Sequence, residues 1–95
     1  MTFTHADTET SSIRTPEGQT ISLGDSYIDM QNRMHLSPNS MMSHELQEGK
    51  KHFLAMDYTY EVENMRYIIT IVNDQVKKIK WLNTDQDIKN TLTKE

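Results

Sequence analysis

The second half of the chain alternates between apolar and polar residues, and this alternation constrains the fold more than any other feature. A period of two places one set of side chains on one face of a strand and the other set on the opposite face. Asp57, Thr59 and Glu61 stand between the apolar and aromatic positions. Those positions are Leu54, Met56, Tyr58, Tyr60 and Val62. The pattern predicts a half-buried strand that begins near Phe53.

Two more strands are expected after it. Met65, Tyr67, Ile69 and Ile71 continue the alternation, and apolar residues on the reverse face mark a central strand. Asn73-Asp74-Gln75 predicts a turn, and residues 76–82 return as a third strand. With a three-residue loop, Ile69 faces Ile79 and Tyr67 faces Trp81, and both are favourable cross-strand pairs. The result is a meander of three antiparallel strands.

A helix is predicted from the stretch ISLGDSYIDM, residues 21–30. Gly24 lets the chain turn, and Asp25 or Ser26 can accept a free backbone amide, with Asp29 completing an approximate capping box. An apolar stripe then recurs at helical spacing. It consists of Tyr27, Met30 and Met34. Pro38 is expected to end the helix, because the residue before a proline avoids the helical region.

Two shorter elements complete the expected organisation. Residues 12–23 predict a hairpin, because Pro16 and Gly18 suit a turn between Ile13 and the apolar pair Ile21 and Leu23. Residues 40–51 predict a second helix that ends near Gly49. Its inward residues are expected to be Met41, Met42 and Leu46.

At 95 residues the chain is expected to form one domain with a modest core. The predicted fold class is α+β, with one or two short helices packed on a three- to four-stranded antiparallel sheet. Residues 1–11 are expected to be a flexible polar N-terminal segment, and residues 12–82 the single α+β domain. Residues 83–95 are expected to form a polar C-terminal tail or a short helix.

Composition excludes several classes of function. The net charge of −4 argues against a nucleic-acid partner, because domains that bind phosphates are usually strongly basic. A local cluster of Lys77, Lys78 and Lys80 is interpreted as a solvated face that discourages aggregation. The chain has no cysteine, so disulfides and thiolate sites are excluded. No apolar run reaches membrane-spanning length, so direct membrane insertion is not expected.

Catalytic and metal sites are not expected. His44-Glu45-Leu46-Gln47-Glu48 begins like the zinc-protease motif, but Glu48 stands where that motif needs a second histidine. His5, His35 and His52 show no ligand spacing either. The carboxylate pairs Asp25/Asp29 and Glu61/Glu63 are better explained by helix capping and by a solvent-facing strand. The chain is therefore interpreted as non-enzymatic and without a cofactor.

The aromatic residues of the sheet leave two interpretations open. They pack in the core against the helices, or they form an exposed patch, since Tyr and Trp are frequent at binding hot spots. We favour the core. The residues concerned are Tyr58, Tyr60, Tyr67 and Trp81.

The order of these motifs resembles a known family. The matching residues are Ile21-x-Leu23-Gly24-x-Ser26-x-x-x-Met30-x-x-x-Met34, then Tyr58-x-Tyr60, then Asn73-Asp74-Gln75-Val76-x-x-Ile79. This order resembles the small bacterial envelope domains of the SmpA/OmlA type, also called BamE-like, whose fold recurs in beta-lactamase inhibitory protein. The similarity covers residues 20–82, while the lipidated cysteine of the lipoprotein members is absent. It implies helices packed on an antiparallel sheet and binding to another protein in the cell envelope.

From the residues and the resemblance together, we expect a protein-binding module exported to the bacterial periplasm or secreted. Thr4-His5-Ala6, which resembles a signal-peptidase site, is a weak indication of export. The alternative is an inhibitor or immunity-type protein that blocks an enzyme or toxin, with a cytoplasmic location also open. The partner's identity and the oligomeric state do not follow from the sequence. The candidate partner-binding residues are His44, Glu45, Glu48, Lys78 and Lys80.

Overall fold

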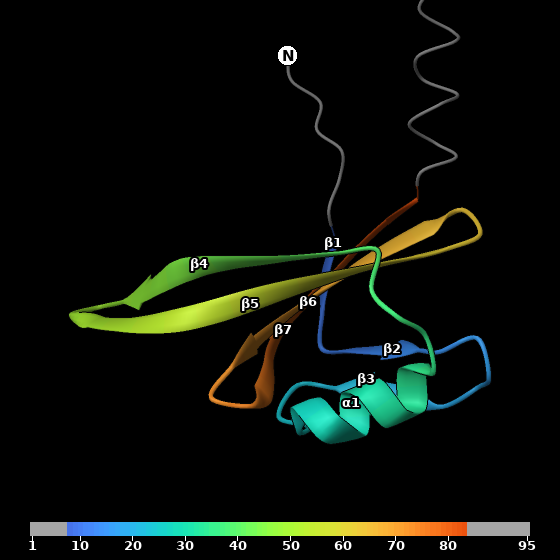
Figure 1. The fold of residues 1–95 in the computed structure, drawn as a ribbon, viewed down its shortest axis with the longest axis horizontal. Helices are drawn as coiled ribbons and strands as arrows, with labels where there is room; N and C mark the ends of the chain where they lie inside the picture. The colour runs from blue at the N-terminus through green and yellow to red at the C-terminus, as the bar shows by residue number, and fades with distance from the viewer. Residues whose placement is uncertain (1–7, 84–95) are drawn as a thin grey trace, which may run out of the picture.

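The computed structural model describes residues 8–83, which are mostly β-strand (Figure 1). Within that range, seven strands and one helix follow one another. They are β1 (Thr8–Thr10), β2 (Ser12–Arg14), β3 (Thr20–Ser22), α1 (Tyr27–Met34), β4 (Ser40–Glu48), β5 (Lys51–Val62), β6 (Met65–Val72) and β7 (Gln75–Asn83).

Five of the strands form one antiparallel sheet in the order β1-β7-β6-β5-β4. The short β2–β3 ribbon and α1 lie together on one side of this sheet (Figure 1). The core fills the space between these layers. It combines Met30 and Met34 of α1 and Ile13 and Ile21 of the ribbon with residues of the sheet, namely Tyr58, Tyr60, Ile69, Ile71, Val76 and Ile79. We call the opposite side of the sheet the open face.

The predicted α+β class, with one or two helices on a three- to four-stranded sheet, is wrong. The described chain is mainly sheet, with one helix of eight residues and a main sheet of five strands. Two segments account for the difference. Residues 40–48, expected to be helical, form β4, and residues 8–10 add β1 at the other edge.

The second helix is absent because residues 40–51 pair with their own continuation. Every residue of β4 has a partner on β5, from Ser40 opposite Thr59 to Glu48 opposite Lys51. Gly49 and Lys50 remain as a two-residue loop, and Gly49 has φ 62°. Glycine with positive φ at the first loop position is typical of a type II′ hairpin turn. Gly49 therefore ends a strand rather than a helix.

The first helix begins where the sequence predicts. Ser26 is the N-cap of α1, and its side-chain oxygen accepts a hydrogen bond from the backbone N–H of Asp29 at 3.1 Å. Met30 and Met34 are buried. The helix ends at Met34 because His35 takes a left-handed conformation with φ 59°. The backbone N–H of His35 donates to the carbonyl oxygen of Gln31 at 3.1 Å. Pro38 lies beyond this end.

The predicted pairing of the last two strands is confirmed, although the turn is shorter than expected. Tyr67 lies opposite Trp81 and Ile69 opposite Ile79. The loop contains only Asn73 and Asp74, both with positive φ, as in a type I′ turn. A bulge beside Thr70 and Ile71 shifts the register by one residue and restores the expected pairs.

The N-terminal hairpin is also confirmed, with Ile13 opposite Ile21. Thr8–Thr10 belong to the segment 1–11 that the sequence predicts to be flexible, but they form β1 and pair with residues 79–81 of β7. Residues 1–7 of that segment and residues 84–95 of the predicted C-terminal tail lie outside the described residues.

Candidate functional site

The outer edge of β4 is the feature of this fold that most resembles an interaction site. β4 lies at the end of the five-stranded sheet and is hydrogen-bonded to β5 on one side, while no strand within residues 8–83 pairs with its other side. Its nine residues run without a register shift. An edge strand presents a row of unpaired backbone N–H and C=O groups, which is a template for another strand.

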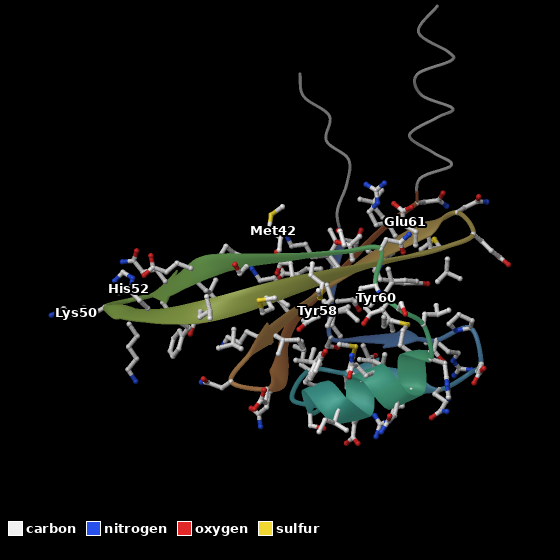
Figure 2. The ribbon with its side chains drawn as sticks, viewed as in Figure 1. Met42, Lys50, His52, Tyr58, Tyr60 and Glu61 are labelled. Atoms are coloured by element: carbon white, nitrogen blue, oxygen red, sulfur yellow. The ribbon has the colours of Figure 1, made fainter. Side chains whose placement is uncertain are left out.

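β4 lacks most of the features by which edge strands usually avoid such pairing, although its two glutamates are charged side chains of the kind that protect an edge. Soluble proteins protect an edge with lysine, proline, a bulge or a very short strand. The sequence of β4, SMMSHELQE, contains neither lysine nor proline, and its pairing with β5 is regular. Two methionines are exposed instead, Met41 by 60% and Met42 by 68%. Figure 2 shows Met42 on the side of β4 away from α1, so it belongs to the open face.

The strand places the predicted site residues on two different faces. Paired residues share a face of a sheet, and successive residues alternate between faces. His44 and Glu48 therefore lie on the open face with Met42, while Glu45 lies on the side of α1. Lys78 and Lys80 also belong to the open face, but they are on β7, separated from β4 by two strands. The five residues do not form one cluster.

His44 belongs to a polar contact that joins three neighbouring strands. Its Nε2 lies 3.1 Å from Oδ2 of Asp57, within ion-pair distance but not aligned as a hydrogen bond. The other oxygen of Asp57 accepts a hydrogen bond from Oγ1 of Thr70 at 2.6 Å. Thr70 is buried, and the carboxylate lies between the hydroxyl and the imidazole. In an activated nucleophile the hydroxyl contacts the imidazole base directly, whereas here the carboxylate separates the two groups. We therefore interpret the contact as structural.

The two glutamates of β4 each lie beside a basic side chain. Glu45 Oε2 lies 2.6 Å from Nδ1 of His52, and Glu48 Oε2 lies 3.2 Å from Nζ of Lys77. Both pairs are exposed, so each contributes little to stability. Both carboxylates of β4 therefore already have partners within the described chain.

A hollow of about 420 Å³ lies beneath the β4–β5 hairpin, on the side of α1. The hairpin extends past the end of β6, since β5 pairs with β6 only from Met56 onward (Figure 1). Figure 2 shows Lys50 and His52 near the end of this projection. The hollow is lined by Tyr27, His52, Phe53, Leu54, Met56, Tyr58, Ile71, Asn73 and Asp74. Leu54 is 71% exposed, so the hollow offers an apolar wall to solvent.

The tyrosines of the hollow and core favour packing over proton transfer. The rings of Tyr27 and Tyr58 lie 5.3 Å apart between centroids. Burial, with a hydrogen bond to Tyr27, raises the pKa of Tyr58 from 10.0 to about 12. Burial likewise raises the pKa of Tyr60 to about 12, and its hydroxyl donates to Sδ of Met30 at 3.6 Å. Both phenols therefore stay protonated over the ordinary pH range, which disfavours either as a general base.

The segment that resembled a zinc motif does not form the helix that the motif requires. In a strand, His44 and Glu48 are separated by about 13 Å along the chain direction, too far to share one metal ion. Among residues 8–83, no group of three or more histidine or carboxylate side chains is arranged to hold a metal. No helix in the same range has the length and apolar character to cross a bilayer.

Comparison of the chain with protein-family models, with curated proteins and with solved structures found no match. The resemblance to SmpA/OmlA domains therefore stays a prediction.

The prediction of site residues did not include the feature that distinguishes β4. His44, Glu45 and Glu48 lie on the strand, but its free edge and its exposed methionines were not anticipated, because residues 40–51 were expected to form a helix. A signal was present in the sequence. Met42, His44 and Leu46 alternate with more polar residues, and Gly49 is followed by a strand pattern. Residues 40–48 thus had the pattern of a strand joined to β5 by a tight turn.

Proposed function

We propose that this chain is a non-enzymatic protein-binding module and that β4 accepts an antiparallel strand from another polypeptide chain. The observation that carries this proposal is the outer edge of β4, which is nine residues long, bears two exposed methionines and has no partner strand in the described part of the chain. Adding a strand to an exposed sheet edge is a recurrent mode of peptide recognition. Main-chain hydrogen bonds supply much of the affinity, and alternate side chains supply specificity.

The methionines of β4 can adapt to different side chains on an added strand. Methionine has an unbranched, polarisable side chain that adapts to different neighbours. Met42 lies on the open face and Met41 on the side of α1, so an added strand meets one methionine on each face. This arrangement supports apolar contacts on both sides of a shared backbone ladder.

We place this binding in the bacterial envelope, where the resemblance to SmpA/OmlA domains suggests that such modules act. Export to the periplasm and membership of that family are part of the same proposal. Finding an export signal encoded in front of this segment would support both the location of the protein and the compartment of its partner. If the gene encodes no such signal, the proposed location in the envelope is refuted, but the proposed strand addition at β4 is not affected.

An inhibitor that blocks an enzyme or toxin is the second candidate. It is favoured by the β4–β5 hairpin, which extends past the end of β6 and presents exposed side chains at its tip. A projecting hairpin is suited to entering the cleft of another protein. The two candidates differ in consequence, because an inhibitor abolishes its partner's activity upon binding.

The test compares two lysine substitutions at equally exposed positions. Met42 on β4 is 68% exposed and Ile28 on α1 is 66% exposed, so neither change opens a cavity. Tagged Met42→Lys should recover the cellular partner at least ten-fold less efficiently than wild type, because a lysine on an edge strand opposes strand addition. Ile28→Lys should recover it normally. Equal recovery by both variants contradicts binding at β4.

A further inference from the structure

The sequence of β4 is complementary to itself when a second β4 runs antiparallel to it. We propose that the strand added to β4 in the isolated protein is the β4 of a second copy, related by a two-fold axis that passes beside His44. This inference rests on the proposed function, since it names the partner of the same edge. It joins the two five-stranded sheets into one continuous sheet.

The two-fold arrangement centred on His44 uses the whole strand. A two-fold axis beside residue 44 places each residue of one copy opposite a residue of the other copy, and the two residue numbers in every pair add up to 88. The nine residues of β4 are then all opposite a residue of the other β4. The resulting pairs are Ser40 with Glu48, Met41 with Gln47, Met42 with Leu46, Ser43 with Glu45, and His44 with itself.

These pairs match apolar with apolar and keep like charges apart. Met42 and Leu46 both lie on the open face, so the two symmetric Met42–Leu46 contacts enclose the central His44 pair. Each carboxylate of one copy lies opposite a serine of the other. Directly opposed like charges destabilise a sheet, whereas apolar cross-strand pairs stabilise it. The arrangement therefore satisfies both conditions along its length.

Neighbouring registers are less favourable. A two-fold axis beside Glu45 places the two Glu45 carboxylates opposite each other, and it pairs Met42 with Glu48. An axis beside Ser43 pairs Met41 with Glu45 and leaves the end of each strand unpaired. Parallel pairing in register stacks Glu45 on Glu45 and Glu48 on Glu48. The register centred on His44 is the one that pairs the full strand without an opposed pair of charges.

The absence of cysteine from the chain allows a direct test by single-cysteine cross-linking. A disulfide needs Cα atoms within about 7 Å of each other. In the proposed register, the two copies of residue 44 face each other across strands about 5 Å apart. The two copies of residue 42 are offset by four residues, which is about 13 Å along the strand.

The proposed register predicts that His44→Cys forms a disulfide-linked dimer under mild oxidation and that Met42→Cys does so at least ten-fold more slowly. His44→Cys also removes the contact between His44 and Asp57, so a second experiment keeps His44 in place. Mixing Met42→Cys with Leu46→Cys should yield the mixed disulfide, whereas each variant alone should remain mostly monomeric under denaturing conditions. Equal cross-linking of all three variants, or none, overturns the proposed register.

Sedimentation of the wild-type protein separates this inference from the proposed function. We expect a reversible dimer that Met42→Lys converts to a monomer and that Ile28→Lys leaves intact. A wild type that stays monomeric at millimolar concentration, yet loses its cellular partner in the Met42→Lys variant, refutes self-pairing and leaves the proposed function standing. If the wild type is a monomer and Met42→Lys changes neither sedimentation nor partner recovery, both self-pairing and the proposed binding at β4 are refuted.

Discussion

At the scale of single residues, Ser26 and Tyr60 show two different ways in which one oxygen atom contributes to the fold. Ser26 satisfies a backbone amide at the start of α1, and this role follows from local sequence alone. Tyr60 is fully buried, and its hydroxyl meets Met30 from an element 30 residues away. The alternation around Tyr60 predicted its burial, but not its neighbour, because that contact depends on where α1 lies on the sheet.

Ser26→Ala should lower the free energy of unfolding by about 1 kcal/mol, because the N–H of Asp29 loses its acceptor. Chemical denaturation measures this change. Ser37→Ala is the matched control, since Ser37 is exposed in the loop after α1 and should change stability by less than about 0.5 kcal/mol. Equal midpoints for Ser26→Ala and the wild type contradict the capping role.

Alkaline pH should destabilise the protein through Tyr58 and Tyr60. Their pKa values are raised from 10.0 to about 12 in the folded state, so folding favours the protonated phenols. The stabilising contribution is complete below about pH 10 and is lost as the pH rises from about 10 to about 12. Tyr60→Phe should therefore make the unfolding free energy fall less steeply over that interval. Denaturation at a series of pH values tests this, and an unchanged slope contradicts it.

At the scale of elements, the strands with strong alternation were predicted correctly from the sequence. The prediction was wrong where one segment fits both the strand period and the helical period. β5, β6 and β7 carry clear alternation, and α1 carries a cap and a helical stripe. In residues 40–48, Met41, Met42 and Leu46 fit a helical face as well as a strand. Pairing with β5 decides between them, and that long-range interaction is not visible in local spacing. β1 is too short and polar to carry any pattern, and it forms because β7 offers an edge.

Thr70→Val should destabilise the β5–β6 pair by about 1–3 kcal/mol, because Asp57 loses the hydroxyl that donates to it. Thr59→Val is the matched control, since Thr59 lies on the same open face and its side chain is less buried. Urea denaturation of both variants measures the difference. If Thr59→Val costs as much as Thr70→Val, the hydrogen bond to Asp57 is not the cause.

Trp81 lies between the two alternatives that the sequence left open. It is half-buried, packs against the core and lies opposite Tyr67. Trp81→Ala should cost about 2 kcal/mol, below the range for a fully buried tryptophan. Its fluorescence should be quenched by iodide to an intermediate degree. Complete protection from iodide, or quenching as strong as that of free tryptophan, contradicts the half-buried position.

At the scale of the whole molecule, the sheet is unequal at its two edges. β1 covers three residues of β7, whereas β4 presents nine residues whose outer side pairs with no strand of residues 8–83. The helix and the ribbon cover one face of the sheet and leave the β4 edge untouched. The proposed strand addition therefore falls on β4, and in this proposal His44, Glu45 and Glu48 take part as residues of a strand rather than as charges.

Residue-resolved amide hydrogen exchange tests the role of β4 most directly. It is measured on the free protein at low concentration and on the complex with its partner or with a second copy. We predict that exchange slows by at least ten-fold at alternate residues of Ser40–Glu48, those whose N–H groups point away from β5, while α1 is unchanged. Slowed exchange confined to the β7 residues around Lys78 and Lys80, with β4 unaffected, contradicts strand addition at this edge.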